Sequence, residues 1–180
     1  MTEYRENPNP RKAYRLTMRI DDAPGPLQVI YSASQFDVMN RECLPPPDEN
    51  PGGLQSPLPT EDVPIALTPV SENEYAGIVY LDGMIDEDYH GRGVCRWQLV
   101  QSQVQLKATG AEAETQFTAY LHRENFQSGE TRKIYYWKGG YPRSRSENFI
   151  DFGETDRDKF KLELRDDLFT ITLGAKEIAP

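Results

Sequence analysis

Apolar and polar residues alternate along most of this chain, in short segments separated by proline and glycine turns. Segment 12–21 shows the pattern clearly, because every second residue from Tyr14 to Ile20 is apolar, which is typical of a half-buried strand. Similar patterns predict strands over 27–39, 63–70, 77–81, 94–106, 114–121, 131–138, 159–164 and 168–173. We expect the last two to form a hairpin, and a change of phase near 34–36 predicts a β-bulge.

The strand pattern also defines the expected fold. No long segment repeats apolar residues at helical spacing between capping residues. About eight short strands with intervening turns are typical of an antiparallel sandwich or barrel. We therefore expect an all-β, antiparallel β-sandwich-like single domain with long loops over 11–180. The polar residues 1–10 are expected to be a disordered spacer, and 124–130 a polar loop.

Residues 40–64 are rich in proline, which fixes φ and removes a backbone donor, so regular structure is not expected there. Long loops without secondary structure are usually functional or mobile. Two interpretations remain open. The segment is either a surface loop tied down by Cys43, or a contact surface formed by 44–64.

The central unit of the chain is 74–106, which reads as strand, acidic loop, glycine turn and strand. The acidic loop, residues 82–88, contains four carboxylates: Asp82, Asp86, Glu87 and Asp88. Such oxygen ligands suit calcium, but the segment lacks the alternating ligands and central glycine of an EF-hand loop. A solvated loop and a recognition element that pairs with basic residues of a partner are the other two interpretations.

Two cysteines, Cys43 and Cys95, each lie beside turn-forming residues. A bridge between them would close a loop of about 50 residues and stabilise the fold by about 4 kcal/mol in the chain-entropy model. Spacing alone leaves two free thiols as the alternative. The two tryptophans, Trp97 and Trp137, are expected in the core, with Trp97 packed against such a bridge.

No catalytic constellation stands out. His90 and His122 are the two histidines, and neither lies in a metalloprotease or serine-hydrolase motif. A nucleophilic Cys95 assisted by His90 is a weaker interpretation than a disulfide. Paired carboxylates for glycoside cleavage exist in any acidic chain, so a hydrolase remains a third hypothesis. We assign no catalytic residue, no metal ligand and no cofactor.

Composition and net charge narrow the classes of possible binding partner. The formal net charge of −9 over 180 residues argues against nucleic acid and anionic membranes, because phosphate binding needs clustered lysine and arginine. No apolar run is long enough to span a bilayer. Since no apolar signal region follows Met1, we expect either a cytosolic chain or one from which a signal has been removed.

Three pieces of the sequence carry a resemblance to a known group of proteins. They are DAPGPLQVI with the following FDVMNRECLPPP, then YAGIVYLDGMIDEDYHGRGVCRWQLVQSQVQLKATG, and later IYYWKGGYPRS. Together they span most of Tyr14–Ser144, and GVCRW after the acidic loop is the most specific. The chain resembles the immunity lipoproteins of Gram-negative bacteria that are encoded beside antibacterial effectors of type VI secretion, in particular phospholipase effectors.

The resemblance implies a periplasmic protein that binds and blocks one toxin, without catalysis. It also implies that Cys43 and Cys95 pair, and that the protein is lipid-anchored to the outer membrane. The chain departs from the group because it has no signal and no lipobox cysteine. Contact with a membrane is therefore expected only through an N-terminal anchor that is absent from this sequence.

The expected function is inhibition of a cognate toxin by binding. The expected contact residues are those of the acidic loop and the turn after it: Asp82, Asp86, Glu87, Asp88, Tyr89, His90 and Arg92. In this hypothesis, acidic charge speeds encounter with a basic toxin surface, and strand-held loops reduce the ordering cost of binding. The alternative is a calcium-stabilised carbohydrate- or surface-binding β module.

Overall fold

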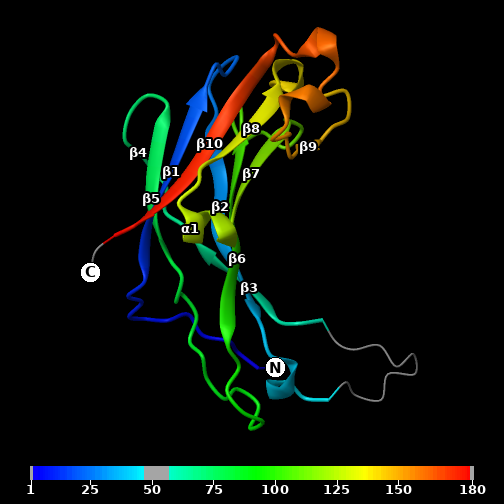
Figure 1. The fold of residues 1–180 in the computed structure, drawn as a ribbon. Helices are drawn as coiled ribbons and strands as arrows, with labels where there is room; N and C mark the ends of the chain where they lie inside the picture. The colour runs from blue at the N-terminus through cyan, green and yellow to red at the C-terminus, as the bar shows by residue number, and fades with distance from the viewer. Residues whose placement is uncertain (1, 47–56, 179–180) are drawn as a thin grey trace, which may run out of the picture.

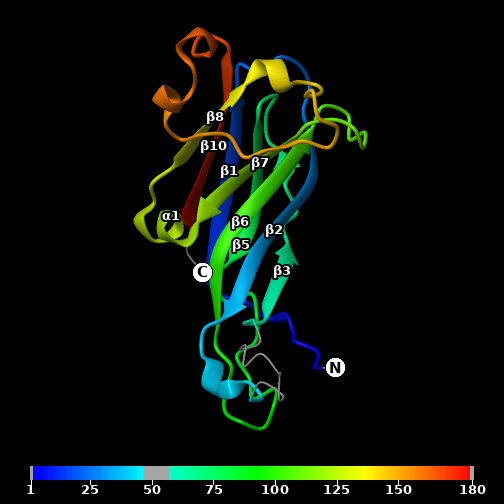
Figure 2. The same cartoon turned by 90° about the vertical axis from the view of Figure 1, so that its right-hand side faces the viewer.

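Two five-stranded sheets pack face to face in a computed structural model of the chain, which describes residues 2–46 and 57–178 (Figures 1 and 2). The first sheet has the order β4 (Thr68–Pro69), β5 (Glu74–Tyr80), β1 (Ala13–Asp21), β10 (Leu168–Glu177), β8 (Arg132–Trp137). The second has the order β3 (Thr60–Pro64), β2 (Gln28–Val38), β6 (Trp97–Lys107), β7 (Gln116–His122), β9 (Ile150–Asp151). Neighbouring strands run antiparallel, except the β7–β9 pair, which is parallel. The expected all-β sandwich is confirmed.

The inward face of each strand supplies the core between the sheets. In β1, Leu16 and Met18 are fully buried, as the alternating pattern predicts. Phe117 of β7 makes edge-to-face contacts with Tyr136 of β8 and Phe169 of β10, at centroid distances of 5.6 and 5.1 Å. Burying one such side chain contributes roughly 1.5–3 kcal/mol, so these rings tie the two sheets together.

β2 contains two bulges against β6. The register shifts between Gln35 and Phe36, which confirms the predicted bulge, and a second time between Val29 and Tyr31, which was not predicted. Because a bulge moves the following side chains to the other face of the sheet, Tyr31 points to solvent although it lies two residues after Val29, which packs against the core. Its hydroxyl donates to Asp62 of β3 at 2.9 Å.

The predicted loop over 124–130 is wrong, because α1 (Arg123–Ser128) occupies this segment. Phe126 is buried against the core and in edge contact with Tyr14 of β1, so the helix, which connects β7 of one sheet to β8 of the other, packs against both sheets. Gly129, at φ 75°, ends the helix in a left-handed conformation that favours glycine. A helix of six residues is too short to reveal its period in the sequence.

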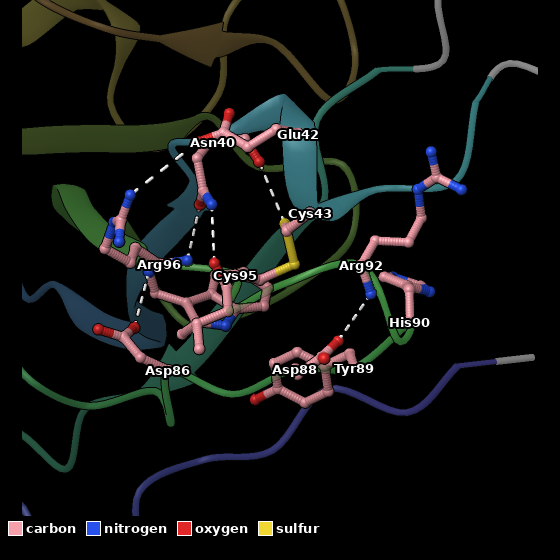
Figure 3. Close-up of a disulfide and its surroundings, with 12 residues drawn as sticks. Asn40, Glu42, Cys43, Asp86, Asp88, Tyr89, His90, Arg92, Cys95 and Arg96 are labelled. Atoms are coloured by element: carbon pink, nitrogen blue, oxygen red, sulfur yellow. Dashed lines mark hydrogen bonds and ion pairs between the residues drawn. A yellow bond between two sulfur atoms is a disulfide. The ribbon is translucent and has the colours of Figure 1, made fainter.

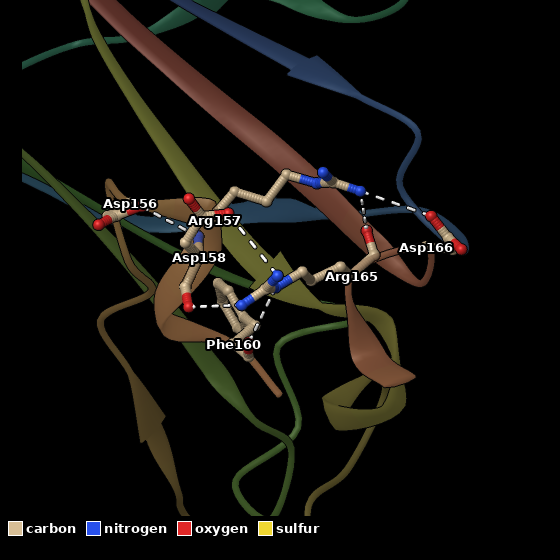
Figure 4. Close-up of polar contacts among 6 residues, drawn as sticks. All are labelled: Asp156, Arg157, Asp158, Phe160, Arg165 and Asp166. Carbon is tan, nitrogen blue, oxygen red and sulfur yellow. Dashed lines mark hydrogen bonds and ion pairs between the residues drawn. The ribbon is translucent and has the colours of Figure 1, made fainter. Parts of the chain in front are cut away.

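The predicted hairpin of 159–164 with 168–173 is also wrong. Segment 168–173 belongs to β10, which pairs with β1 and β8 instead. The earlier segment forms the short 3-10 helices η3 (Arg157–Lys159) and η4 (Leu162–Leu164). The guanidinium of Arg165 donates to the carbonyls of Phe160 and Asp158 at 3.1 and 2.8 Å, which holds this segment in a compact turn (Figure 4).

Trp137, expected in the core, lies at the end of β8 and is 39% exposed. Its ring packs over Gly139 of η2 (Lys138–Gly140). None of the helices among the described residues is long and apolar enough to cross a membrane.

Candidate binding surface at the disulfide end

A disulfide joins Cys43 to Cys95 at one end of the sandwich (Figure 3). Cys43 ends the 3-10 helix η1 (Arg41–Cys43) that follows β2, and Cys95 lies just before β6. Both residues are fully buried, and Trp97 packs against them. The disulfide is therefore a confirmed feature, and it fixes the loops that leave two neighbouring strands.

Asn40 reinforces the same junction. Its side-chain amide donates to the carbonyl of Val94 at 2.7 Å, and its oxygen accepts from the amide of Arg96 at 2.8 Å (Figure 3). The amide of Met39 also donates to the carbonyl of Arg96 at 2.8 Å. Three hydrogen bonds thus hold the end of β2 to the chain on both sides of Cys95.

Asp82, at the start of the acidic loop, binds backbone rather than facing a partner. Its carboxylate accepts the amides of Arg11 and Lys12, each at 2.9 Å. Burial raises the pKa of Asp82, but these two hydrogen bonds, a third from its own amide and the charge of Lys12 together lower the pKa below its ordinary value. Asp82 therefore joins the acidic loop to the segment that enters β1.

The next carboxylates also fold the loop onto itself. Asp86 accepts the amide of Trp97 at 2.8 Å, and Asp88 accepts the amide of Arg92 at 3.0 Å (Figure 3). The carbonyl of Glu87 accepts the amide of Cys95 at 2.9 Å, which closes the glycine turn beside the disulfide. The loop is therefore held by its own hydrogen bonds.

The N-terminal arm, residues 2–10, packs along this loop, so the expected disordered spacer is wrong. The amide of Asn7 donates to Gly83 at 2.8 Å, and the carbonyl of Arg5 accepts the amide of Ile85 at 2.9 Å. The guanidinium of Arg5 also pairs with both carboxylate oxygens of Glu87. These contacts lie more than seventy positions apart along the chain, so local sequence gives no sign of them.

Tyr89 and His90 are half-buried beneath the arm rather than projecting as contact anchors. The ring of Tyr4 lies in edge contact with Tyr89 at 5.0 Å and with Trp97 at 5.2 Å. Its hydroxyl shares a hydrogen bond with Nε2 of His90 at 3.0 Å. Tyr4 was not identified from the sequence, although it is the residue that joins the arm to this end.

Of the expected contact residues, Asp86, Asp88 and Arg92 are exposed. Two exposed apolar side chains that the sequence did not single out lie at the same end, Met39 at 56% and Val94 at 46%. We define the tip surface as the exposed residues of this end: Met39, Asp86, Asp88, Arg92, Val94 and Arg96. It combines apolar side chains with charges of both signs.

The acidic loop does not form a calcium site in this arrangement. Its carboxylates bind different partners, and residues 2–46 and 57–178 contain no cluster of three or more histidine, cysteine, aspartate or glutamate residues that could hold a metal ion. The interpretation of Cys95 as a nucleophile assisted by His90 is wrong, since Cys95 is in the disulfide. Residues 47–56 of the suggested contact segment 44–64 lie outside the described residues.

Comparisons of this chain with protein-family models, with curated proteins and with solved structures found no match. Its function is therefore proposed from the sequence resemblance together with the geometry and chemistry of its own residues.

Proposed function

We propose that this chain is an immunity protein that binds and inhibits a cognate antibacterial toxin, with the tip surface as the contact. The observation that carries this proposal is the preorganisation of the acidic loop. A disulfide, the Asn40 hydrogen bonds and the N-terminal arm hold the loop before any partner arrives. Because little freedom is left to lose on binding, such a surface supports tight association.

The disulfide also supports a compartment for the proposed function. Disulfides persist in oxidising compartments and are rare in the cytosol, where thiols stay reduced. A periplasmic location, with or without a lipid anchor, is compatible with the Cys43–Cys95 bridge. An inhibitor in that compartment would meet its toxin after the toxin has entered the cell envelope.

The chemistry of the tip surface suggests how it would block an enzyme. Met39 and Val94 provide apolar contact area, and the charges around them would set the orientation of the partner. The net charge of −9 would speed encounter with a basic toxin surface. In this mechanism the tip covers the active-site cleft of the toxin, which excludes its substrate.

The test is to purify the oxidised chain, recover its partner from the secreted proteins of the source bacterium, and measure inhibition of the purified partner's activity. We expect Val94→Arg and Asp88→Arg each to weaken binding at least tenfold, because they place cationic side chains against a basic partner. Leu162→Arg is the matched control, since Leu162 is 74% exposed and belongs to η4, which lies in the orange segment at the opposite end of the sandwich (Figure 1). An inhibited partner that binds all three variants equally would exclude the tip as the contact.

A further inference from the structure

A second surface lies at the side of the sandwich, where one sheet edge is unprotected. Proteins usually block their edge strands with prolines, charges, short strands or covering segments. The edge strand β3 contains Pro64 and the acidic pair Glu61 and Asp62. The edge strand β8 is covered, because Tyr135 exchanges two backbone hydrogen bonds with Glu154 at 2.7 and 2.9 Å. The edge strand β9 is protected by its shortness, because it has two residues.

The edge formed by β5 is less protected over its second half, where the segment 65–67 lies against Gly77 but the described part of the chain adds no strand beside 78–80. β4 pairs with Tyr75 and Ala76 of β5, and within residues 2–46 and 57–178 no strand pairs with 77–80 on that side. On the other side β5 pairs with β1 along its whole length. The exposed half of β5 therefore presents a short strand edge to solvent.

The register of β5 with β1 shows which backbone groups face outward. Leu81 donates to Lys12, and Asn73 accepts from Ile20, so odd-numbered residues of β5 hydrogen-bond to β1. In an antiparallel ladder the intervening residues direct their amides and carbonyls the other way. For Ile78, both backbone groups face outward, as does the amide of Tyr80, and within the described part of the chain none of these three groups has a hydrogen-bond partner.

Apolar surface flanks this edge. The side chains of Ile78 and Tyr80 are 42% and 37% exposed on the outer face of the sheet. On the inner side, a pocket of about 220 Å³ opens between β3 and β5. Phe36, Val63 and Val79 are among the residues that line it. A strand added here would place alternate side chains over Ile78 and toward this pocket.

Two cations lie in the same cross-strand row as Ile78, with Arg15 one strand and Lys176 two strands in from this edge. Arg15 of β1 is the cross-strand neighbour of Ile78 on one side and of Lys176 of β10 on the other. Like charges directly opposite each other destabilise a sheet, and among the residues described neither cation makes an ion pair. A carboxylate that reaches across Ile78 toward Arg15 would offset this repulsion.

We propose that β5 accepts an extended acidic segment of a partner protein as an added strand. The segment would hydrogen-bond to Ile78 and to the amide of Tyr80, direct apolar side chains over Ile78 and into the pocket, and extend an aspartate or glutamate across the sheet toward Arg15. This recognition mode takes affinity from backbone hydrogen bonds and specificity from alternate side chains. The surface is separate from the tip surface, so the inference does not depend on the proposed inhibition.

The test selects peptides from a phage-displayed library of random nonapeptides against the folded, oxidised chain. We expect selected peptides to alternate apolar residues with aspartate or glutamate, and to slow hydrogen exchange at the amides of Ile78 and Tyr80. Ile78→Pro removes an amide that faces away from β1 and leaves the hydrogen bonds between β5 and β1 in place. It should weaken peptide binding at least tenfold. Ile78→Val is the matched control and should bind within about twofold, because it keeps the amide.

A charge variant covers the case in which Ile78→Pro does not fold. The double variant Arg15→Glu with Lys176→Glu should select basic rather than acidic peptides from the same library. The proposal is overturned if no peptides are selected, or if the selected peptides leave the exchange of Ile78 and Tyr80 unchanged. It is also overturned if sedimentation shows a dimer in which these amides are already protected, because a second copy would then occupy the edge.

Discussion

Tyr4 and His90 share a hydrogen bond of 3.0 Å between a phenol and an imidazole that lie 86 positions apart in the chain. This contact makes the N-terminal arm part of the disulfide end. The loop that we propose as a binding surface therefore depends on a segment that the sequence suggested was a spacer.

Removal of the Tyr4 ring should loosen this end. We expect Tyr4→Ala to lower the free energy of unfolding by about 1–3 kcal/mol, because it removes edge contacts with Tyr89 and Trp97. Tyr4→Phe keeps the rings and loses one hydrogen bond, so it should cost only about 0.5–1.5 kcal/mol. Urea denaturation followed by tryptophan fluorescence measures both, and equal losses in the two variants would show that the ring contacts contribute nothing.

Loss of the disulfide should destabilise the whole sandwich. The bridge closes a separation of 52 residues, and the chain-entropy model assigns about 4 kcal/mol to a loop of this length. We expect the double variant Cys43→Ala with Cys95→Ala to lose up to this amount in urea denaturation. Reductant should lower the stability of the natural chain and leave the double variant unchanged; a natural chain that is insensitive to reductant would contradict the prediction.

Glu114 should make the fold sensitive to acid. This buried carboxylate closes the turn between β6 and β7, where it accepts amides of Thr109, Gly110 and Ala111 at 2.9–3.0 Å. The hydrogen bond from the Thr109 amide is the main cause that lowers the pKa of Glu114 below its ordinary value of 4.5. Because the pKa of Glu114 is lower in the folded state, its ionised carboxylate stabilises the fold fully at pH values above its unfolded-state pKa. This stabilisation is lost as the pH falls through its folded-state pKa.

We therefore expect the melting temperature to fall below about pH 4.5, with Glu114 contributing to the slope. Glu114→Gln should be less stable at pH 7, because a neutral amide replaces a charged acceptor. It should also show a shallower loss between pH 4.5 and pH 2, measured by thermal unfolding in matched buffers. Parallel pH profiles for the two proteins would rule out this role for the carboxylate.

Calcium should have no effect on stability through the acidic loop. The carboxylates of Asp82, Asp86 and Asp88 accept backbone amides, so they do not converge on one point. We expect the melting temperature in calcium to equal that in chelator at constant ionic strength. A rise with calcium that Asp88→Asn abolishes would revive the calcium-stabilised module as a function.

The alternation of apolar and polar residues predicted the strands in which every second side chain faces the core. β1 and β7 follow it closely, and their inward residues Leu16 and Phe117 are fully buried. The same pattern predicted a strand wrongly where side-chain hydrogen bonds determine the backbone conformation. The alternating residues Phe160, Leu162 and Leu164 resemble a strand, but the hydrogen bonds of Arg165 bend this segment into two 3-10 helices.

The candidate site was predicted in part. The sequence located the acidic loop and the cysteine beside it, and the bridge is present. It did not reveal that Asp82 binds the amides before β1, or that Tyr4 covers His90. These contacts join segments distant in sequence, and backbone amides as partners leave no trace in residue identity.

The bridge between Cys43 and Cys95 also determines how this molecule would respond to force. The covalent ring that it closes contains β3 from one sheet, and β4 and β5 from the other. Tension applied at the two ends of the chain cannot extend the ring, so the load passes directly from β2 to β6 through the sulfur atoms. Reduction would release roughly 170–190 Å of additional length, at about 3.3–3.6 Å per residue. A protein anchored at one end and held by a partner at the other would thus remain short under load for as long as its bridge is intact.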